Sequence, residues 1–324
     1  MNYILRRLGF YLVAAWASVT LNFLLPRLMP GDPASAVFAS AQGRLDPETI
    51  AAMREAYGLS DDPLLAQYWQ YLQGIARLDF GISTAFFPTP VMEVVQTGLS
   101  WTLLLGLTAT IIAFALGTLI GVISAWRRGG IVDSAIPPLA LFIGSFPYFW
   151  LATFIVFYLG FRWSILPEAY AYELGLSPAF SWAFISSVFV HLILPASTVV
   201  LVSLGGWILG MRNTMVSTLS EDYVSLAEAK GLSQRRVMLR YAARNALLPN
   251  MTSFGMSLGF VLSGSLITES VFNYPGLGNQ LVRAVRLLDF PLMQTLFLFI
   301  TLSVLAANLL VDILYLRLDP RVRT

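Results

Sequence analysis

The sequence predicts an all-α polytopic membrane protein with six transmembrane helices and both termini in the cytoplasm. Hydrophobic residues make up 57% of the 324 residues and charged residues only 12%, whereas soluble domains carry about a quarter charged residues. The hydrophobic residues fall into long runs, and basic residues gather in every second connection between them. Composition, run length and charge placement therefore predict the same fold class.

Each predicted span is an apolar run long enough to cross about 30 Å of hydrocarbon. The runs are Phe10–Leu28, Leu99–Trp126, Ser134–Leu159, Val188–Met211, Leu248–Phe272 and Phe290–Leu316. No small-residue cleavage site follows the first run, so we expect it to be a retained span rather than a signal peptide. Phe146-Pro147-Tyr148 inside the third run predicts a kink, because proline leaves a backbone carbonyl without its helical partner.

The basic residues determine the predicted topology. With the amino terminus inside, the cytoplasmic segments hold 13 of the 20 lysine and arginine residues. The external segments hold the other seven, spread over a longer polar chain. Because cytoplasmic loops carry an excess of basic residues, this distribution predicts that both termini lie inside.

A long polar stretch, Gly31–Gly98, is predicted to lie outside after the first span. It holds eight acidic residues against three arginines, and short helices are expected at Pro47–Tyr57 and Leu64–Ile75. We interpret it as a solvated loop packed against the span ends; a docking surface for an extracytoplasmic partner is the alternative. The predicted divisions are 1–29 (amino-terminal segment and first span), 30–98 (external loop subdomain) and 99–324 (five-helix core with a cytoplasmic loop at 217–249).

The cytoplasmic loop, Ser217–Pro249, has the start and stop signals of two short helices. Ser220 is the predicted N-cap of the first helix, Lys230 lies in its last turn, and Gly231 takes the position of a left-handed C-cap. Ser233 is predicted to begin a second helix that ends at Pro249. A capped helix–Gly–helix block between spans suggests a surface that a cytoplasmic partner contacts. The alternative is that its basic residues only attract anionic lipid and set the topology.

The sequence offers little catalytic chemistry. There is no cysteine and no P-loop, HExxH or EF-hand pattern, so we expect no ATP site, cofactor or metal site in this chain. A GxSxG match at Gly255–Gly259 lies inside a predicted span rather than at a strand-to-helix turn. Its Ser257 is expected to differ in depth from His191 by roughly 10 Å. We therefore interpret the small residues as helix-packing positions and His191 as a packing or hydrogen-bonding residue.

The cytoplasmic loop also carries a family resemblance. Ala227-Glu228-Ala229, then Gly231 and Asn245–Pro249, resemble the EAA loop of ABC-importer permeases, and Asp222–Leu232 resembles the dipeptide/oligopeptide/nickel branch. Tyr241 departs from the His expected there, and Ala243 from the commoner Leu, but neither lies in the short helix. Further resembling stretches are Pro30–Pro33, Tyr57–Leu59, Asp79–Ser83, Glu269–Gly278 and Asp319–Arg321.

The resemblance implies a type I ABC importer permease fold and one transmembrane subunit of an ATP-driven importer for peptides or similar oligomeric solutes. The implied partners are a second homologous permease, two ATPase subunits that bind ATP and Mg, and an extracytoplasmic solute-binding protein. The implied location is a bacterial or archaeal cell membrane. Oligosaccharides are the alternative substrate. The alternative classes are an ATP-independent secondary transporter or channel, and a membrane enzyme built on Ser257 and His191.

Two candidate sites follow from the resembling residues. ATPase coupling within 220–231 is assigned to Tyr223, Ala227, Glu228, Ala229 and Gly231. The two alanines are small enough for close approach, and Glu228 can accept charge-assisted hydrogen bonds. An external gate is assigned to Glu269, Pro275 and Gly276, with a Glu269 side chain that snorkels to the interface as the alternative. Asp312 is interpreted as a residue that forms hydrogen bonds between helices near the interface.

Overall fold

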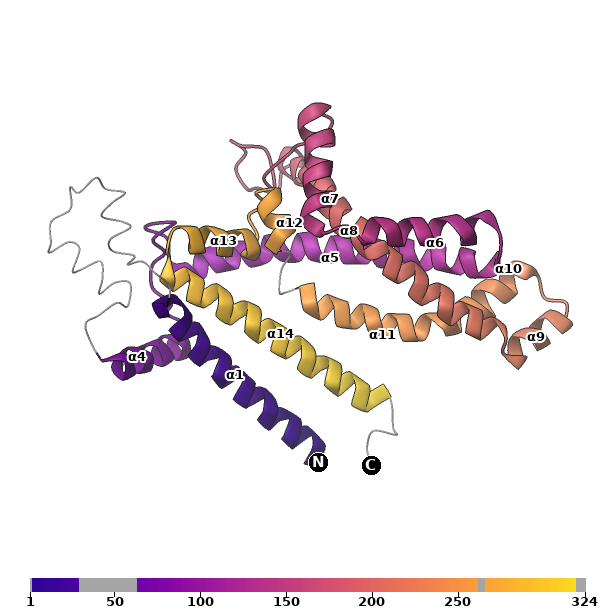
Figure 1. Ribbon diagram of the computed structural model, residues 1–324, viewed down its shortest axis with the longest axis horizontal. Coiled ribbons are helices and arrows are strands. Elements are labelled where there is room, and N and C mark those ends of the chain that lie inside the picture. The colour runs from indigo at the N-terminus through magenta and orange to yellow at the C-terminus, as the bar shows by residue number, and fades with distance from the viewer. Residues whose placement is uncertain (1, 29–62, 262–265, 319–324) are drawn as a thin grey trace. The chain divides into compact units, whose positions relative to one another are not determined.

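The structure is a computed structural model that describes residues 2–28, 63–261 and 266–318. Within these ranges the regular structure is helical, apart from one isolated antiparallel bridge between Ile82 and Pro90, and the longest non-helical connections are residues 78–90 and 163–181 (Figure 1). The chain forms two compact units. The first comprises Met1–Leu103, Leu262–Ser270 and Pro275–Thr324, and the second comprises Leu104–Val261 and Val271–Tyr274.

The first unit contains α1 (Asn2–Leu28), α4 (Leu64–Arg77), the start of α5 (Val91–Trp126), α12 (Leu266–Val271), α13 (Leu277–Arg286) and α14 (Phe290–Leu318). Here α1 lies along α14, and α13 packs on the start of α14 (Figure 1). Buried Val91, Leu281 and Leu292, from three different helices, belong to one apolar core. The predicted helix at Leu64–Ile75 is confirmed as α4, whereas Pro47–Tyr57 lies outside the described residues.

The second unit contains the rest of α5, followed by α6 (Ile131–Gly144), α7 (Tyr148–Ile155), the π-helix η1 (Val156–Arg162), α8 (Trp182–Leu219), α9 (Asp222–Ala229), α10 (Gln234–Arg236), the π-helix η2 (Val237–Ala243) and α11 (Arg244–Val261). Glycines let these helices approach closely, as predicted for packing in lipid. A Cβ at Gly205 of α8 would lie 3.0 Å from the Ala140 backbone of α6, and one at Gly117 of α5 would lie 2.3 Å from Trp207.

Four described helical segments are long and apolar enough to span a membrane: Arg7–Leu25, Val91–Trp126, Trp182–Leu219 and Phe290–Leu309. The pair α6 and Tyr148–Arg162 would make a fifth, bent by 99°. This bend confirms the kink predicted at Pro147, which is the N-cap of α7. The predicted span Leu248–Phe272 corresponds to α11 and α12, and residues 262–265 between them lie outside the description. The count of six spans therefore stays a prediction.

Candidate functional site

The short helix α9 is held by an apolar core that several helices share. Val224 and Ala227 are only 2% and 3% exposed, and the i, i+3 spacing places them on one face of α9. They belong to the same buried cluster as Met215 of α8, Val237 of η2 and Ala246 of α11. The core therefore attaches α9 to the end of α8 and to the helix that follows it.

The amino-terminal cap of α9 differs from the prediction. Helix α8 continues to Leu219, so Ser220 is the C-cap of α8, and its hydroxyl donates to the Ser217 carbonyl (2.7 Å). The N-cap of α9 is Glu221 instead, with no side-chain capping bond. The prediction failed because Ser220 satisfies the last turn of a long helix equally well, and its sequence position alone does not separate the two roles.

The carboxyl-terminal end of α9 confirms the prediction for Gly231. Its φ is +73°, the left-handed conformation in which glycine has no steric penalty. The Gly231 amide donates to the Glu228 carbonyl (2.8 Å), and the Leu232 amide donates to the Ala227 carbonyl (3.3 Å). This turn fixes the direction in which the chain leaves α9.

The outer face of α9 presents Tyr223 and Leu226, which are 39% and 56% exposed, together with exposed Glu228 and Ala229. Four of the five predicted coupling residues, counting Gly231, are thus accessible. Ala227 is not, because its methyl group packs into the core of this chain; it positions the helix rather than offering a surface. Leu226 was missed by the sequence reasoning. Helical spacing could have found it, since it lies opposite the face that Val224 and Ala227 bury.

The second predicted helix starts where expected but does not stop at Pro249. Ser233 is the N-cap of α10, and the chain stays helical through η2 and α11 to Val261. Pro249 lies inside this helix, although proline removes one helical hydrogen bond. The side-chain amide of Asn250 donates to the Thr214 hydroxyl of α8 (2.8 Å) and to the Ala246 carbonyl (2.9 Å). The motif around Pro249 therefore joins α11 to α8.

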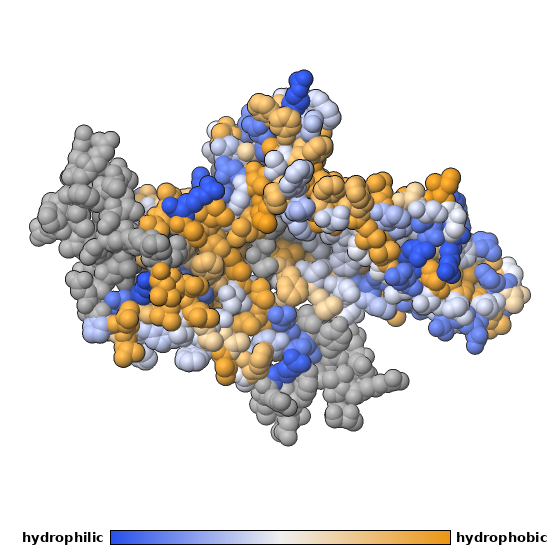
Figure 2. Space-filling model, in the orientation of Figure 1, coloured by the Kyte–Doolittle hydropathy of each residue, from blue (hydrophilic) through white to orange (hydrophobic). Residues whose placement is uncertain are grey.

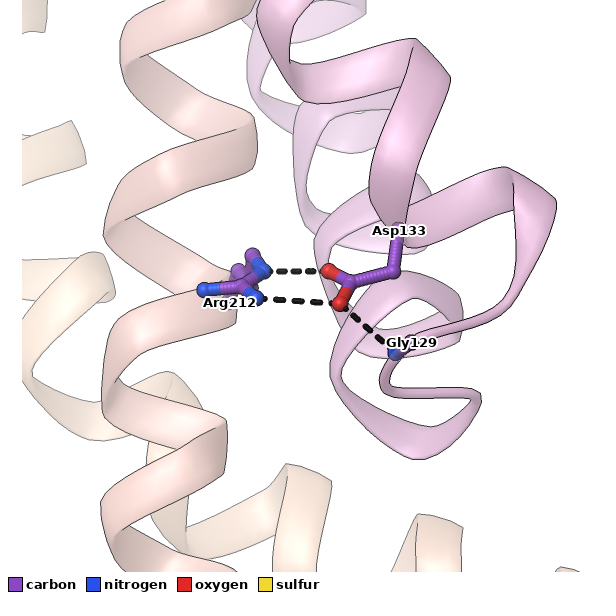
Figure 3. Close-up of polar contacts among 3 residues, drawn as sticks. All are labelled: Gly129, Asp133 and Arg212. Carbon is purple, nitrogen blue, oxygen red and sulfur yellow. Dashed lines mark hydrogen bonds and ion pairs between the residues drawn. The ribbon is translucent and has the colours of Figure 1, made fainter.

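An ion pair that the sequence reasoning did not find joins α6 to α8. Arg212 donates to both carboxylate oxygens of Asp133, with 3.0 Å between Nη2 and Oδ2, and Gly129 donates its amide to the same Oδ2 (3.0 Å) (Figure 3). Bidentate Arg–carboxylate pairs are geometrically specific. Asp133 thus holds the turn after α5 and the start of α6 against α8. No sequence signal pairs these residues, which are 79 positions apart.

The predicted gate residue Glu269 lies in the first unit and is 1% exposed, so it does not snorkel to an interface. Its Oε1 accepts from the Thr102 hydroxyl (2.9 Å), and its Oε2 accepts from the Gly278 amide (2.7 Å) and the Asn279 amide (3.4 Å). The Thr102 hydroxyl in turn accepts from the Leu277 amide (2.8 Å). The carboxylate therefore caps the first turn of α13, where the helix dipole favours negative charge.

The other two gate candidates, Pro275 and Gly276, form the turn into α13. Gly276 is its N-cap, and a Cβ there would lie 2.4 Å from the Glu269 carboxyl carbon. The Pro275 carbonyl accepts a long hydrogen bond (3.5 Å) from Gln280. All three predicted gate residues thus lie around the start of α13, with Glu269 and Gly276 buried and Pro275 half-buried.

Three further candidate residues make local or helix-to-helix bonds. Asp312 accepts from the Tyr11 hydroxyl (2.7 Å) and pairs with Arg7 (3.0 Å), which confirms the predicted helix-to-helix bonding. His191 Nδ1 lies 2.8 Å from the Ser187 carbonyl, and Ser257 donates to the Phe254 carbonyl (2.8 Å), each within its own helix. Among the residues that the structure describes, no group of His, Asp or Glu could hold a metal ion.

Comparison with known proteins covers nearly the whole chain. The model of the family described as binding-protein-dependent transport system inner membrane component matches residues 117–324. A second model, for the amino-terminal part of such membrane components, matches residues 1–95. The motif from Glu228 to Pro249 and the gate candidates all lie inside the first match.

Relatives match over their full length as well. The chain is 34% identical over 340 residues to the dipeptide transport system permease protein DppB of Escherichia coli (strain K12), with 100% of this chain and 99% of the relative covered. It is 33% identical over 323 residues to DppB of Lactococcus lactis subsp. cremoris (strain MG1363), and 33% identical over 326 residues to the glutathione transport system permease protein GsiC of Shigella flexneri serotype 5b (strain 8401), with the same coverage. The chain therefore belongs to the family of binding-protein-dependent transport system inner membrane components, the membrane permeases of ABC importers.

Proposed function

We propose that this chain is one permease subunit of an ATP-driven importer for peptides, that it forms half of the translocation pathway, and that it couples to a separate ATPase through residues 220–231. The full-length relatives are permeases named for dipeptides and for glutathione, which is itself a short peptide. Peptides are therefore the proposed substrate class.

The proposed partners are a second homologous permease, two ATPase subunits and an extracytoplasmic solute-binding protein. In this assembly ATP and Mg²⁺ are bound by the ATPases, and this chain holds neither. The proposed location is the cell membrane of a bacterium or archaeon, with several spans and both termini in the cytoplasm.

The observation that carries the coupling proposal is the exposed apolar side of α9. Helices as short as this one are marginal in water on their own, yet α9 is fixed by Val224 and Ala227 to a shared core while Tyr223 and Leu226 stay exposed. Apolar side chains on a rigid, short helix are suited to a partner's groove. Glu228 and Ala229 are also exposed, at the carboxyl-terminal end of α9, and complete the proposed contact.

The proposed transmission path lies inside the second unit. A push on α9 reaches α8 through the shared core around Met215. The Arg212–Asp133 pair then connects α8 to the start of α6. Because packed cores resist deformation, these helices would move together as a rigid group when the ATPases close on ATP.

The proposed external gate is the turn formed by Pro275 and Gly276 with buried Glu269. The carboxylate ties α12 to the first turn of α13 through the Gly278 and Asn279 amides, and to α5 through the Thr102 hydroxyl. We assign it the role of holding this turn in one position until the permease changes state.

Reconstitution tests the proposed function. The tagged chain is purified together with its co-purifying subunits and placed in proteoliposomes. These are supplied with the binding protein and with either labelled dipeptide or labelled oligosaccharide. Dipeptide uptake that requires both ATP and the co-purified ATPases is expected. Uptake by the chain alone, driven by an ion gradient, would show a secondary transporter, and uptake of the oligosaccharide in place of the peptide would refute the substrate class.

A further inference from the structure

A pocket of about 310 Å³ opens at the end of α5, and the proposed function does not use it. Its walls come from α5 with the turn after it, from α10 and from η2; the lining residues are Ile123, Trp126, Arg127, Gln234, Arg235 and Met238. Two arginines and one amide thus face the same space as three apolar side chains. In Figure 2, hydrophilic and hydrophobic side chains lie interleaved over the region of α9 and α10.

The walls of this pocket are held by the unit's own core. Val237, which follows Arg236 directly, is fully buried in the same cluster as Val122 and Ala125 of α5. The Arg236 and Val237 amides both donate to the Ser233 carbonyl (2.8 and 3.0 Å), which fixes the turn that carries Gln234 and Arg235. Packing therefore fixes the backbone that carries Gln234 and Arg235, while the side chains of Arg127, Gln234 and Arg235 are exposed.

An exposed apolar stripe on α5 leads to the pocket. Ile112, Leu116, Leu119 and Ile123 follow one another at spacings of four, three and four residues, so they share one helix face, and each is between 40% and 60% exposed. At 1.5 Å per residue the stripe is about 16 Å long, close to half of the 30 Å hydrocarbon core of a bilayer. It ends at Trp126, a residue type that favours the membrane interface. The stripe thus matches the depth of one leaflet.

We propose that this pocket binds the phosphate of an anionic phospholipid, with Arg127 and Arg235 as its cationic contacts and Gln234 as a hydrogen-bond donor. One acyl chain lies on the stripe from Ile123 to Ile112. Basic pockets beside transmembrane helices suit anionic headgroups, and an arginine guanidinium matches the geometry of phosphate oxygens. The apolar stripe favours a lipid over a soluble phosphate, because only a lipid has an acyl chain that can pack on it.

Lipid titration of the purified full chain, with its co-purifying subunits, tests the site by native mass spectrometry. Dioleoyl phosphatidylglycerol is compared with dioleoyl phosphatidylcholine and with inorganic phosphate. The double variant Arg127→Gln, Arg235→Gln is expected to bind phosphatidylglycerol roughly thirtyfold more weakly than the wild type, and Arg235→Gln alone roughly fivefold. If the double variant does not fold, the affinity of Arg235→Gln for phosphatidylglycerol provides the test instead.

The matched control is Arg128→Gln with Arg236→Gln, which removes the same charge from the adjacent exposed positions. It is expected to retain binding within about threefold, since these arginines do not line the pocket. An equal loss in both double variants would show a diffuse surface charge and overturn the site. Equal binding of the two lipids would also overturn it, as would full competition by inorganic phosphate. Loss of the ATPases from the pocket variant with unchanged lipid binding would assign the pocket to the ATPase instead.

Discussion

At the scale of single residues, the close approach of Gly276 to Glu269 leaves no room for a methyl group. A Cβ at Gly276 would lie 2.4 Å from the carboxyl carbon of a side chain that three donors already hold. Gly276→Ala is therefore expected to displace the carboxylate from the first turn of α13 and to destabilise the unit by about 1–3 kcal/mol. Peptide uptake should fall while the ATPases still co-purify, if this turn is the external gate.

Gly255→Ala is the matched control for that variant, because a Cβ there would meet no atom within 4 Å. The thermal stability of each detergent-solubilised protein is read from the loss of its monodisperse size-exclusion peak. Equal midpoints for the two variants would contradict the predicted clash, and a destabilised Gly276→Ala with normal uptake would leave the turn as a structural feature alone.

The left-handed conformation of Gly231 allows a second test at the residue scale. At a φ of +73°, a β-branched residue is strained by roughly 1–2 kcal/mol, whereas asparagine tolerates this region. Gly231→Val should insert into the membrane at normal levels but misdirect α9, and so lose uptake and substrate-stimulated ATP hydrolysis. Gly231→Asn should keep both. Identical coupling in the two variants, measured in the reconstituted complex, would show that the turn does not aim the helix.

At the scale of elements, one face of α9 is buried in the core of the chain and another is exposed to a partner. Val224 and Ala227 fix it from inside, and Leu226 faces out. Burying an exposed leucine against a partner is worth about 1.5–3 kcal/mol. Leu226→Asp is therefore expected to weaken ATPase binding by at least about tenfold without unfolding the chain. Ser225→Asp adds the same charge to an exposed position on the same helix and should have a smaller effect; an equal effect of both would point to charge rather than an apolar contact.

Helix α8 carries two adjacent glycines, and only the first of them, Gly205, faces α6. A Cβ at Gly205 would meet the Ala140 backbone at 3.0 Å, whereas one at Gly206 would meet nothing within 4 Å. Gly205→Ala should force the helices apart and lower the stability of the solubilised chain by about 1–3 kcal/mol. Gly206→Ala should leave it unchanged or slightly raise it, because alanine favours helix. Thermal midpoints of the two single variants measure the difference, and a reversed order would refute the packing.

At the scale of the whole molecule, the sequence predicts the helical class because long apolar runs dominate the chain, and α1, α5, α8 and α14 match four of those runs. It does not predict their ends. The two longest helices, α5 and α8, have 36 and 38 residues and continue past the apolar runs, since a helix that is already formed extends through polar residues at little cost. Pro249 shows the same limit, because the helix continues past this proline to Val261, and the next residue, Asn250, bonds to α8.

The candidate sites were predictable where they rest on local spacing and not where they rest on distant partners. Gly231 follows from its position after a short helix, and Leu226 could have been found from the helical period. Glu269 was singled out by its motif, but its contact with Thr102 joins residues 167 positions apart. Asp133 and Arg212 lie 79 positions apart. Such pairs depend on how helices pack, which periodicity within one helix does not encode.

The predicted topology can be tested on this chain with two single cysteines, because it has none of its own. Ser177, between η1 and α8, and Ser233, before α10, are both exposed in the second unit. The charge distribution places the first outside and the second in the cytoplasm. Ser177→Cys should react with a membrane-impermeant maleimide in intact cells, and Ser233→Cys only after permeabilisation. The cysteine-free parent reports background labelling. Reaction of both from the same side would contradict the predicted order of spans, and with it a cytoplasmic position for α9, because α8 would then not cross the membrane between the two sites.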